Sequence, residues 1–336
     1  MSYYVGWVGL TAIAVGFPWL YPEPYYHVLG FNVLMMATMG TSWNILGGYA
    51  GYKSLGHSAF FGLGAYAVAI AARYWSWDPL WSSPVLAVGV SLVAAGLGWV
   101  MLRTTGSAFV IASIAMLLIF RILALNLRGI TGGSSGISQP LPPWPAQYAQ
   151  LPFYYYMLSV WILSVAAAAF IRRTRFGLGL QAIREDEEKA SAVGVNTTAY
   201  KILAFVVSAY FVALAGGIWS YRQVHISPIF AFDIMVAVEM ILVAMLGGLG
   251  TVFGPTLGAV ILVPLADFLR FRLGSTQLHI AVLGVAMLAV ILGLPKGLVP
   301  TAAALVEKRG RQGSAYAGAK RIGEMLVGKR EESSGE

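Results

Sequence analysis

Residues 172–201 read RRTRFGLGLQAIREDEEKASAVGVNTTAYK, and this stretch decides the fold class of the chain. It carries ten of the 36 charged residues in a sequence of 336 residues, of which only 11% are charged. Apolar runs lie on both sides of it, whereas an ordinary soluble protein contains about 25% charged residues. The pattern indicates a membrane protein with a charged segment outside the bilayer.

The rest of the chain is apolar enough to cross a bilayer many times. Hydrophobic residues make up 58% of the sequence, and its mean hydropathy is +0.73. Because a bilayer core about 30 Å thick needs roughly 20 mostly apolar residues per helix, we expect an all-α integral membrane protein with about ten transmembrane helices. Two of these regions depart from an ordinary span: 234–246 is short, and the Gly-rich stretch 47–64 suggests a broken or re-entrant element. The expected spans are 5–20, 28–48, 58–74, 84–102, 108–127, 155–171, 202–221, 234–246, 251–269 and 278–294.

The basic residues set the expected orientation, because cytoplasmic loops of membrane proteins carry an excess of Lys and Arg. If 172–201 faces the cytoplasm and ten spans alternate, sixteen basic residues fall on the cytoplasmic side and five on the other. We therefore expect both termini in the cytoplasm. The same rule explains the formal charge of +8 better than nucleic-acid binding does, since the sequence has no basic stripe with interleaved stacking aromatics.

The expected organisation is one transmembrane domain, residues 1–306, followed by a flexible cytoplasmic tail, residues 307–336. The tail mixes charges with Gly and Ser and lacks sustained apolar periodicity. An external loop at 128–153 is long enough to be ordered, with a short helix of its own. It could receive a binding partner or serve only as a connector.

Within the charged segment the pattern favours one short amphipathic helix over 180–193. An apolar stripe at helical spacing accompanies a run of charges from Arg184 to Lys189. Glu185 lies four residues before Lys189, in the orientation that favours an ion pair. A solvated helix of an ordinary cytoplasmic loop would show the same pattern.

The end of this helix also has a sequence signal. Gly194 can adopt the left-handed conformation that terminates a helix. Asn196 or Thr197 can then cap the next one. The segment is therefore expected to be an ordered lever between two membrane spans.

Six blocks of sequence carry a resemblance to a known family. They are GGYAGYKSLGHSAFFGLGAYAVAI (47–70), RGITGGSSGI (128–137), AIREDEEKASAVGV (182–195), YKILAFVVSAYFVALAGGIW (200–219), LGGLGTVFGPTLGAVIL (246–262) and LPKGLVP (294–300). In the same order, they resemble blocks of the permeases of branched-chain amino acid ABC importers, specifically the LivM-type subunit. The resemblance covers nearly the whole chain except the first span and the tail.

The resemblance implies a permease domain that translocates branched-chain, hydrophobic amino acids by alternating access in a bacterial or archaeal plasma (inner) membrane. It also implies a homologous second permease, two cytoplasmic ATP-binding subunits and an extracytoplasmic solute-binding protein as partners. Segment 181–195 would dock on an ATPase. The residues expected to couple to it are Gln181, Ala182, Ile183, Arg184, Glu185, Asp186 and Gly194. Relatives of the family serve other amino acids, amides or urea, so these substrates remain alternatives.

The residues themselves indicate that the energy comes from partner subunits. No G-x-x-x-x-G-K-[ST] phosphate loop occurs in the sequence, so we expect ATP to be used by partners and no cofactor to be bound by this chain. An enzyme would need convergent nucleophiles, acids or metal ligands, so we expect no catalytic residues and no metal site. The remaining alternative is an ion-coupled secondary carrier, which would need coupling-ion ligands and usually internal repeats.

Gly250, Gly254 and Gly258 form two successive small-xxx-small intervals. Such intervals let membrane helices approach closely. We favour helix packing as their role. A hinge or a pathway role is the alternative, since Pro255 can break a helix locally.

A substrate pathway is expected beside the Gly-rich stretch 47–64. Glycine density there indicates irregular backbone, whose polar groups protein or water must satisfy at membrane depth. His57 has no second His or carboxylate at ligand spacing, so a hydrogen bond in place is favoured over a proton relay or a metal site. The expected pathway residues are Asn44, Gly51, Ser54, Gly56, His57 and Phe60.

Overall fold

The computed structural model describes residues 2–145 and 148–273, and also positions 284, 285, 288, 293, 297–302 and 304. Of the tenth expected span, 278–294, only four positions are described. The expected tail, 307–336, lies outside the described residues.

Nine of the ten expected spans coincide with helices of the structure. These helices are α1 (Ser2–Leu20), α2 (Pro24–Asn44), α3 (His57–Trp75), α4 (Pro79–Met101), α5 (Gly106–Asn126), α7 (Leu151–Arg173), α10 (Thr197–Gln223), α12 (Ile234–Gly247) and α13 (Gly254–Leu273). The shorter elements are the π-helix η1 (Ile45–Tyr49), α6 (Arg128–Thr131), the 3₁₀ turn η2 (Gly133–Ser135), β1 (Ile137–Ser138), α8 (Arg175–Glu185), α9 (Glu187–Ala192), β2 (His225–Ile226) and α11 (Pro228–Ala231).

Six helices of the described chain are long and apolar enough to cross a membrane. They are α4, α5, α7, α10, the continuous stretch Pro228–Gly247 and α13. Their outward faces are apolar: Leu92 on α4 and Ile111 on α5 are each 67% exposed. Such faces suit lipid hydrocarbon and not water. The chain is therefore a multi-pass membrane protein.

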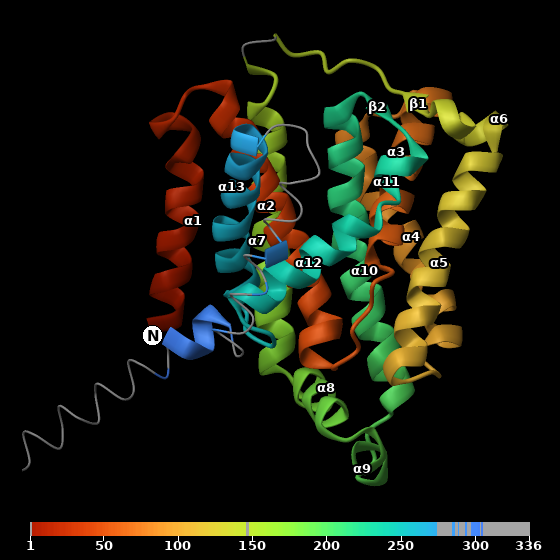
Figure 1. Cartoon of the computed structure of the whole chain (residues 1–336), viewed down its shortest axis with the longest axis vertical. Helices are drawn as coiled ribbons and strands as arrows, with labels where there is room; N and C mark the ends of the chain where they lie inside the picture. The colour runs from red at the N-terminus through yellow and green to blue at the C-terminus, as the bar shows by residue number, and fades with distance from the viewer. Residues whose placement is uncertain are drawn as a thin grey trace, which may run out of the picture.

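The helices form one bundle with α2 and α10 near its centre and α1 and α5 at opposite edges (Figure 1). Helix α2 is buried continuously from Leu34 to Asn44. Helices α7, α12 and α13 pack against α2, whereas α3 and α4 pack against α10. The two central helices therefore connect the two halves of the bundle.

The two ends of the bundle differ in structure. Helices α8 and α9 lie at one end, whereas α6, β1 and β2 lie at the other (Figure 1). The loop at 128–153 contains the short helix α6, as expected, and its strand β1 pairs antiparallel with β2 through Ile137 and Ile226. This two-residue ladder is the departure of the described chain from an all-α fold.

Helices α3 and α10 touch backbone to backbone through glycines. A Cβ atom on Gly64 would overlap the carbonyl oxygen of Ala213, and one on Gly216 would overlap that of Phe61. Glycine is required at both positions because no side chain fits between the two helices. This contact between Gly64 and Gly216 was not predicted from the sequence.

The Gly-rich stretch is irregular only in part. Helix α2 passes into η1 at Ile45, residues 50–56 follow without helix or strand, and α3 begins at His57. We call residues 50–56 the extended segment. Its Tyr52 contacts Lys201 in the first turn of α10, whereas His57 contacts Ser208, seven residues farther along. Because seven helical residues rise about 10 Å, the chain turns back into the bundle before α3 starts.

Protein groups satisfy the backbone of the extended segment. Trp43 Nε1 donates to the Ser54 carbonyl at 2.7 Å, and Ser113 Oγ accepts from the Leu55 amide at 3.0 Å. The Gly56 amide donates to Ser54 Oγ at 3.2 Å. Irregular backbone is tolerated at membrane depth where protein supplies such partners, as was expected for this stretch.

Candidate functional site

The charged segment 172–201 forms two helices, α8 and α9, and not the single helix expected over 180–193. The chain breaks at Asp186, whose backbone is extended with φ −163° and ψ 111°. Asp186 Oδ1 accepts a hydrogen bond from the Lys189 amide at 3.0 Å and so caps α9. The expectation was wrong because Asp competes with helix continuation by bonding nearby backbone. An Asp followed by two Glu is itself the composition of a helix start.

The break also changes the expected ion pair. Lys189 Nζ lies 2.9 Å from Asp186 Oδ2, in place of a pair with Glu185. A continuous helix is needed to bring residues four apart onto one face, and the break at Asp186 removes it. The two predictions for the end of the segment are confirmed, because Gly194 has φ +90° and Asn196 caps α10 by accepting from the Ala199 amide.

Helix α8 packs its apolar stripe inward and sends one charged side chain toward the bundle. Leu180 and Ile183 are buried, while Gln181 and Glu185 are exposed. Arg184 Nη1 donates to the carbonyl oxygen of Gly48 in η1 at 2.7 Å. Gln181 and Glu185 are therefore open to a partner, and Arg184, which is also exposed, bonds inward to η1.

Arg184 lies beside two irregular regions between membrane helices, the extended segment and the turn between α12 and α13. A Cβ on Gly51, in the extended segment, would lie 3.2 Å from Arg184 Cγ. A Cβ on Gly250, in the turn between α12 and α13, would lie 3.0 Å from Arg184 Nη1. One side chain of α8 thus contacts both irregular regions of the bundle.

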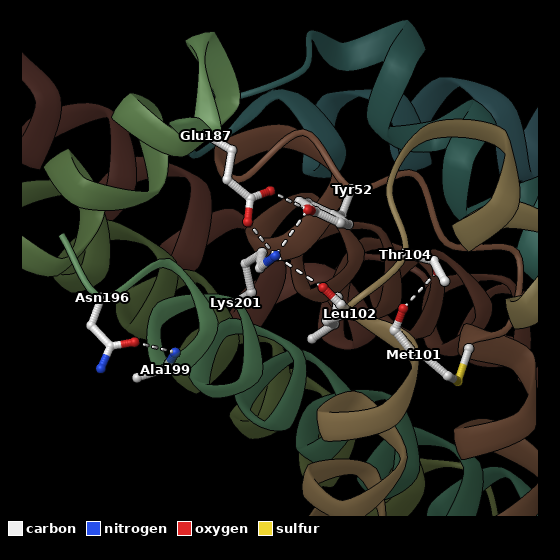
Figure 2. A network of polar contacts seen from close by, with 8 residues as sticks. All are labelled: Tyr52, Met101, Leu102, Thr104, Glu187, Asn196, Ala199 and Lys201. Carbon is white, nitrogen blue, oxygen red and sulfur yellow. Dashed lines mark hydrogen bonds and ion pairs between the residues drawn. The ribbon is translucent and has the colours of Figure 1, made fainter. Parts of the chain in front are cut away.

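A second connection, which was not predicted from the sequence, joins α9 to the bundle (Figure 2). Lys201 is buried, and its Nζ donates to Tyr52 Oη at 3.1 Å, to the Leu102 carbonyl at 2.9 Å and to Glu187 Oε1 at 2.5 Å. Tyr52 Oη in turn donates to Glu187 Oε2 at 2.5 Å. We call Tyr52, Glu187 and Lys201 the latch.

The pKa values within the latch are shifted in opposite directions. Burial raises the pKa of Tyr52, and its hydrogen bond to Glu187 raises it further. Burial also acts to raise the pKa of Glu187, but hydrogen bonds from Lys201 and Tyr52 outweigh it, so that this pKa is lowered. At neutral pH the latch therefore holds a carboxylate and a neutral phenol.

Two clefts open beside α8 and α9. The larger, of about 1130 Å³, lies between the extended segment, the start of α5 and α9, and its lining includes Lys53, Arg184 and Glu188. The smaller, of about 400 Å³, lies between η1, α8 and the turn after α12. The larger cleft presents charged groups of both signs, which suits a zwitterion or a charged protein partner.

The expected pathway residues do not form one open site. Gly51 borders the larger cleft. The other five, Asn44, Ser54, Gly56, His57 and Phe60, are buried. His57 Nε2 lies 2.7 Å from Ser208 Oγ, and its ring packs edge-on against Phe205. This geometry agrees with the hydrogen bond in place that was favoured for His57.

Asn44 holds the turn between α12 and α13. Its Nδ2 donates to the Thr251 carbonyl at 2.8 Å, and its Oδ1 accepts from the Gly250 amide at 2.9 Å. Both polar ends of the side chain are thus committed to backbone groups. Asn44, the last residue of α2, therefore fixes the turn between α12 and α13 to the end of α2.

The three expected packing glycines separate into two groups. A Cβ on Gly258 would overlap the Val243 carbonyl, and one on Gly254 would lie 2.7 Å from the Gly248 carbonyl, so both lie where α13 touches α12 or its end. Gly250 instead has φ +76° and lies in the turn. The packing prediction fails for Gly250 because α12 ends at Gly247, before that residue.

A family model described as "Branched-chain amino acid transport system / permease component" matches residues 29–291. The chain is a member of this permease family. The matched region of the permease begins in α2 and contains the extended segment, the charged segment and the turn after α12. The latch residues, Arg184 and Asn44 therefore all lie within the matched region.

The permease is similar to proteins of two named kinds. It is 29% identical over 321 residues to the high-affinity branched-chain amino acid transport system permease protein LivM of Salmonella typhimurium, covering 87% of this chain and 74% of that protein. It is 24% identical over 281 residues to the LivH permease protein of Escherichia coli, covering 78% of this chain and 90% of that protein. It is 27% identical over 245 residues to the probable LivM of Methanocaldococcus jannaschii, covering 65% of this chain and 71% of that protein. No solved structure matches the chain.

The side-chain hydrogen bonds that join segments far apart in the sequence include those of Asn44, His57 and Arg184. Among the residues that the structure describes, no group of three or more His, Cys, Asp or Glu side chains could hold a metal ion. The residues missed from the sequence are Tyr52, Glu187 and Lys201. A Lys directly before the long apolar run 202–221 was the available signal, because a charge that enters the membrane needs a partner.

Proposed function

We propose that this chain is the LivM-type permease subunit of an ATP-binding cassette importer for branched-chain, hydrophobic amino acids. The observation that carries this proposal is the family match over residues 29–291, together with α8 and α9 placed between two membrane helices. The similarity to LivM-type and LivH-type permeases supports a homologous second permease as its partner. Two ATP-binding subunits and an extracytoplasmic solute-binding protein complete the proposed assembly.

The proposed work of α8 and α9 is to receive an ATPase subunit. Helix α8 presents Gln181 and Glu185 outward, and Gly194 ends the segment, so a partner can contact this surface without unfolding the bundle. Arg184 then carries movement of α8 inward to η1 through its bond to Gly48. Transport by alternating access requires such a mechanical connection, because the energy source lies outside this chain.

We place the conduit beside the extended segment. The larger cleft reaches this segment at Gly51 and offers charged groups of both signs to an amino acid leaving toward the cytoplasm. Farther into the bundle, Ser54, His57 and Phe60 are buried, which corresponds to a closed conformation at that depth. In this proposal the conduit opens when the extended segment moves.

The function is tested by transport. The permease is co-reconstituted into liposomes with the second permease, the ATP-binding subunits and the solute-binding protein of the same gene cluster, and uptake of radiolabelled L-leucine is measured. We expect uptake that requires ATP on the ATPase side and is reduced by excess isoleucine or valine.

Two other outcomes identify the alternatives. Competition by an amide or urea, without competition by isoleucine or valine, would reassign the substrate within the family. Uptake driven by an ion gradient in the absence of ATP would identify a secondary carrier and overturn the proposal.

The proposed topology has ten spans and both termini in the cytoplasm of a plasma membrane. The N-terminal end of α1 lies at the end of the bundle that carries α8 and α9, which agrees with an even number of crossings, six, between the N-terminus and α8 (Figure 1). Ser138 in β1 lies at the opposite end, and both Ser138 and Ser191 are exposed. On this cysteine-free chain, Ser138→Cys should react with an impermeant thiol reagent from outside and Ser191→Cys from inside; the reverse pattern would refute the orientation.

A further inference from the structure

The latch joins four segments that are far apart in the sequence. Lys201 lies in the first turn of α10, Tyr52 in the extended segment, Glu187 at the first position of α9, and Leu102 at the end of α4. All three protons of an ammonium group have acceptors here, and both oxygens of Glu187 accept hydrogen bonds (Figure 2). The side chains of Lys201, Tyr52 and Glu187 thus each bond to the other two and form a closed ring of hydrogen bonds.

The positions of the charges agree with the helices that carry them. Glu187 opens α9, where the helix dipole favours a negative charge. The Leu102 carbonyl belongs to the end of α4, where the dipole favours a positive charge such as that of Lys201. The latch therefore selects one arrangement of these helix ends.

Stability alone is a weak reason for this arrangement. The side chain of Lys201 is 4% exposed and that of Glu187 is 30% exposed, so the pair has given up much of its hydration. The loss of hydration offsets much of the attraction between buried charges, and apolar residues of similar volume often serve stability equally well. A buried charged ring does, however, impose a geometry that apolar packing does not.

The connection made by Arg184 lies at the other end of the same region. Arg184 of α8 bonds to Gly48 in η1, and Glu187 of α9 bonds to Tyr52 four residues later. The two cytoplasmic helices thus hold both sides of the junction between a π-helix and the extended segment. π-Helical turns inside α-helices occur frequently at functional sites.

We propose that Tyr52, Glu187 and Lys201 are positioning residues that fix α9 to the extended segment, so that displacement of α9 moves the chain leading into α3. This inference rests on the proposed function for its role in transport. The attachment of α9 to the extended segment can be tested without transport. An experiment with two arms therefore separates the two ideas.

The first arm measures the position of α9 in the purified permease. Spin labels are attached at Ser107→Cys, in the first turn of α5, and Ser191→Cys, in α9, both of which line the larger cleft. Double electron–electron resonance should give one narrow distance distribution in the otherwise unaltered chain. Glu187→Gln and Tyr52→Phe should broaden or displace it, and Tyr52→Phe removes only one hydroxyl group, so that folding is retained.

The matched control is Glu188→Gln, which removes the same charge from the next residue. Glu188 is exposed and takes no part in the latch, so this variant should retain the narrow distribution. An unchanged distribution in both Glu187→Gln and Tyr52→Phe would overturn the proposal. An equal broadening in Glu188→Gln would also overturn it, because the effect would then belong to the charge of α9 and not to the latch.

The second arm uses the reconstituted importer and measures L-leucine transported per ATP hydrolysed. Glu187→Gln should lower this ratio at least about fivefold, the smallest effect expected of coupling between two sites. A displaced α9 with an unchanged ratio would overturn the positioning role. If the unaltered importer does not transport leucine, the proposed function fails, while the spin-label distances still decide whether the latch positions α9.

Discussion

The extended segment and the turn between α12 and α13 both interrupt membrane helices, but they are held in different ways. Side chains from other helices hold the extended segment, including Trp43 at the Ser54 carbonyl and Ser113 at the Leu55 amide. The turn is held by direct backbone packing of glycines at the junction of α12 and α13, and by hydrogen bonds of two side chains, Asn44 and the turn's own Thr251. Hydrogen bonds to side chains can be exchanged one at a time, whereas glycine packing leaves no space for adjustment.

The same helix supports both regions. Trp43 and Asn44 are the last two residues of α2, and one reaches the extended segment while the other reaches the turn. We infer that the turn is the rigid part of this junction and the extended segment is the movable part. Substitutions in the two regions should therefore differ in size and in kind.

The largest effect is expected from filling the glycine contact. In Gly258→Leu, the new side chain would overlap the Val243 carbonyl, so α12 and α13 must separate. Losses from such overpacking together with broken packing exceed about 4 kcal/mol, and we expect little monodisperse protein in size-exclusion chromatography. Gly96→Ala on α4, with no atom within 4 Å of the new Cβ, is the control and should behave as the unaltered chain. Normal yield and elution of Gly258→Leu would contradict the rigid contact.

A smaller effect is expected at Asn44. Asn44→Ala leaves the Gly250 amide and the Thr251 carbonyl without their partner, at a cost of roughly 2 to 4 kcal/mol. The thermal unfolding midpoint in detergent should fall clearly. Asn126→Ala is the control, because Asn126 is exposed and donates only to a carbonyl of its own helix. Equal midpoints for the two variants would show that Asn44 does not hold the turn.

Removing a side-chain partner of the extended segment should lower stability less than removing Asn44 from the turn. Ser113→Ala removes the acceptor of the Leu55 amide, and we expect a loss of about 1 to 2 kcal/mol, below that at Asn44. Ser91→Ala is the matched control, since Ser91 donates to the carbonyl three residues earlier, as Ser113 also does. A midpoint for Ser113→Ala lower than that for Asn44→Ala would reverse the comparison.

The smallest effect concerns pH and the latch. Because the pKa of Glu187 is lowered in the folded protein, its contribution to stability is present above the pKa of an unfolded Glu and is lost as pH falls through the folded value. Unfolding midpoints of the unaltered chain and Glu187→Gln should differ at pH 7 and draw together as the pH falls below the pKa of an ordinary Glu, about 4.3, toward the lower folded value. A difference that persists unchanged at pH 3 would show that the carboxylate charge is not responsible.

Local chemistry made much of this fold predictable. Nine expected spans coincide with helices, because each apolar run is long enough to require its own backbone hydrogen bonds in lipid. Gly194 and Asn196 behaved as predicted, since termination and capping depend on neighbouring residues. The single helix over 180–193 failed at Asp186, where two local preferences competed and capping prevailed.

The sequence by itself determined nine helices of the described chain, the charged segment between two of them and the family of the chain. Only the tertiary structure decided that Lys201 meets Tyr52 and Glu187, and that Asn44 meets Gly250. A side chain's partner across 149 or 206 residues depends on how whole helices pack, and no local spacing encodes that distance. For the same reason the sequence placed Arg184 on a charged surface helix, where the structure also leaves it exposed, but could not show its bond to the Gly48 carbonyl.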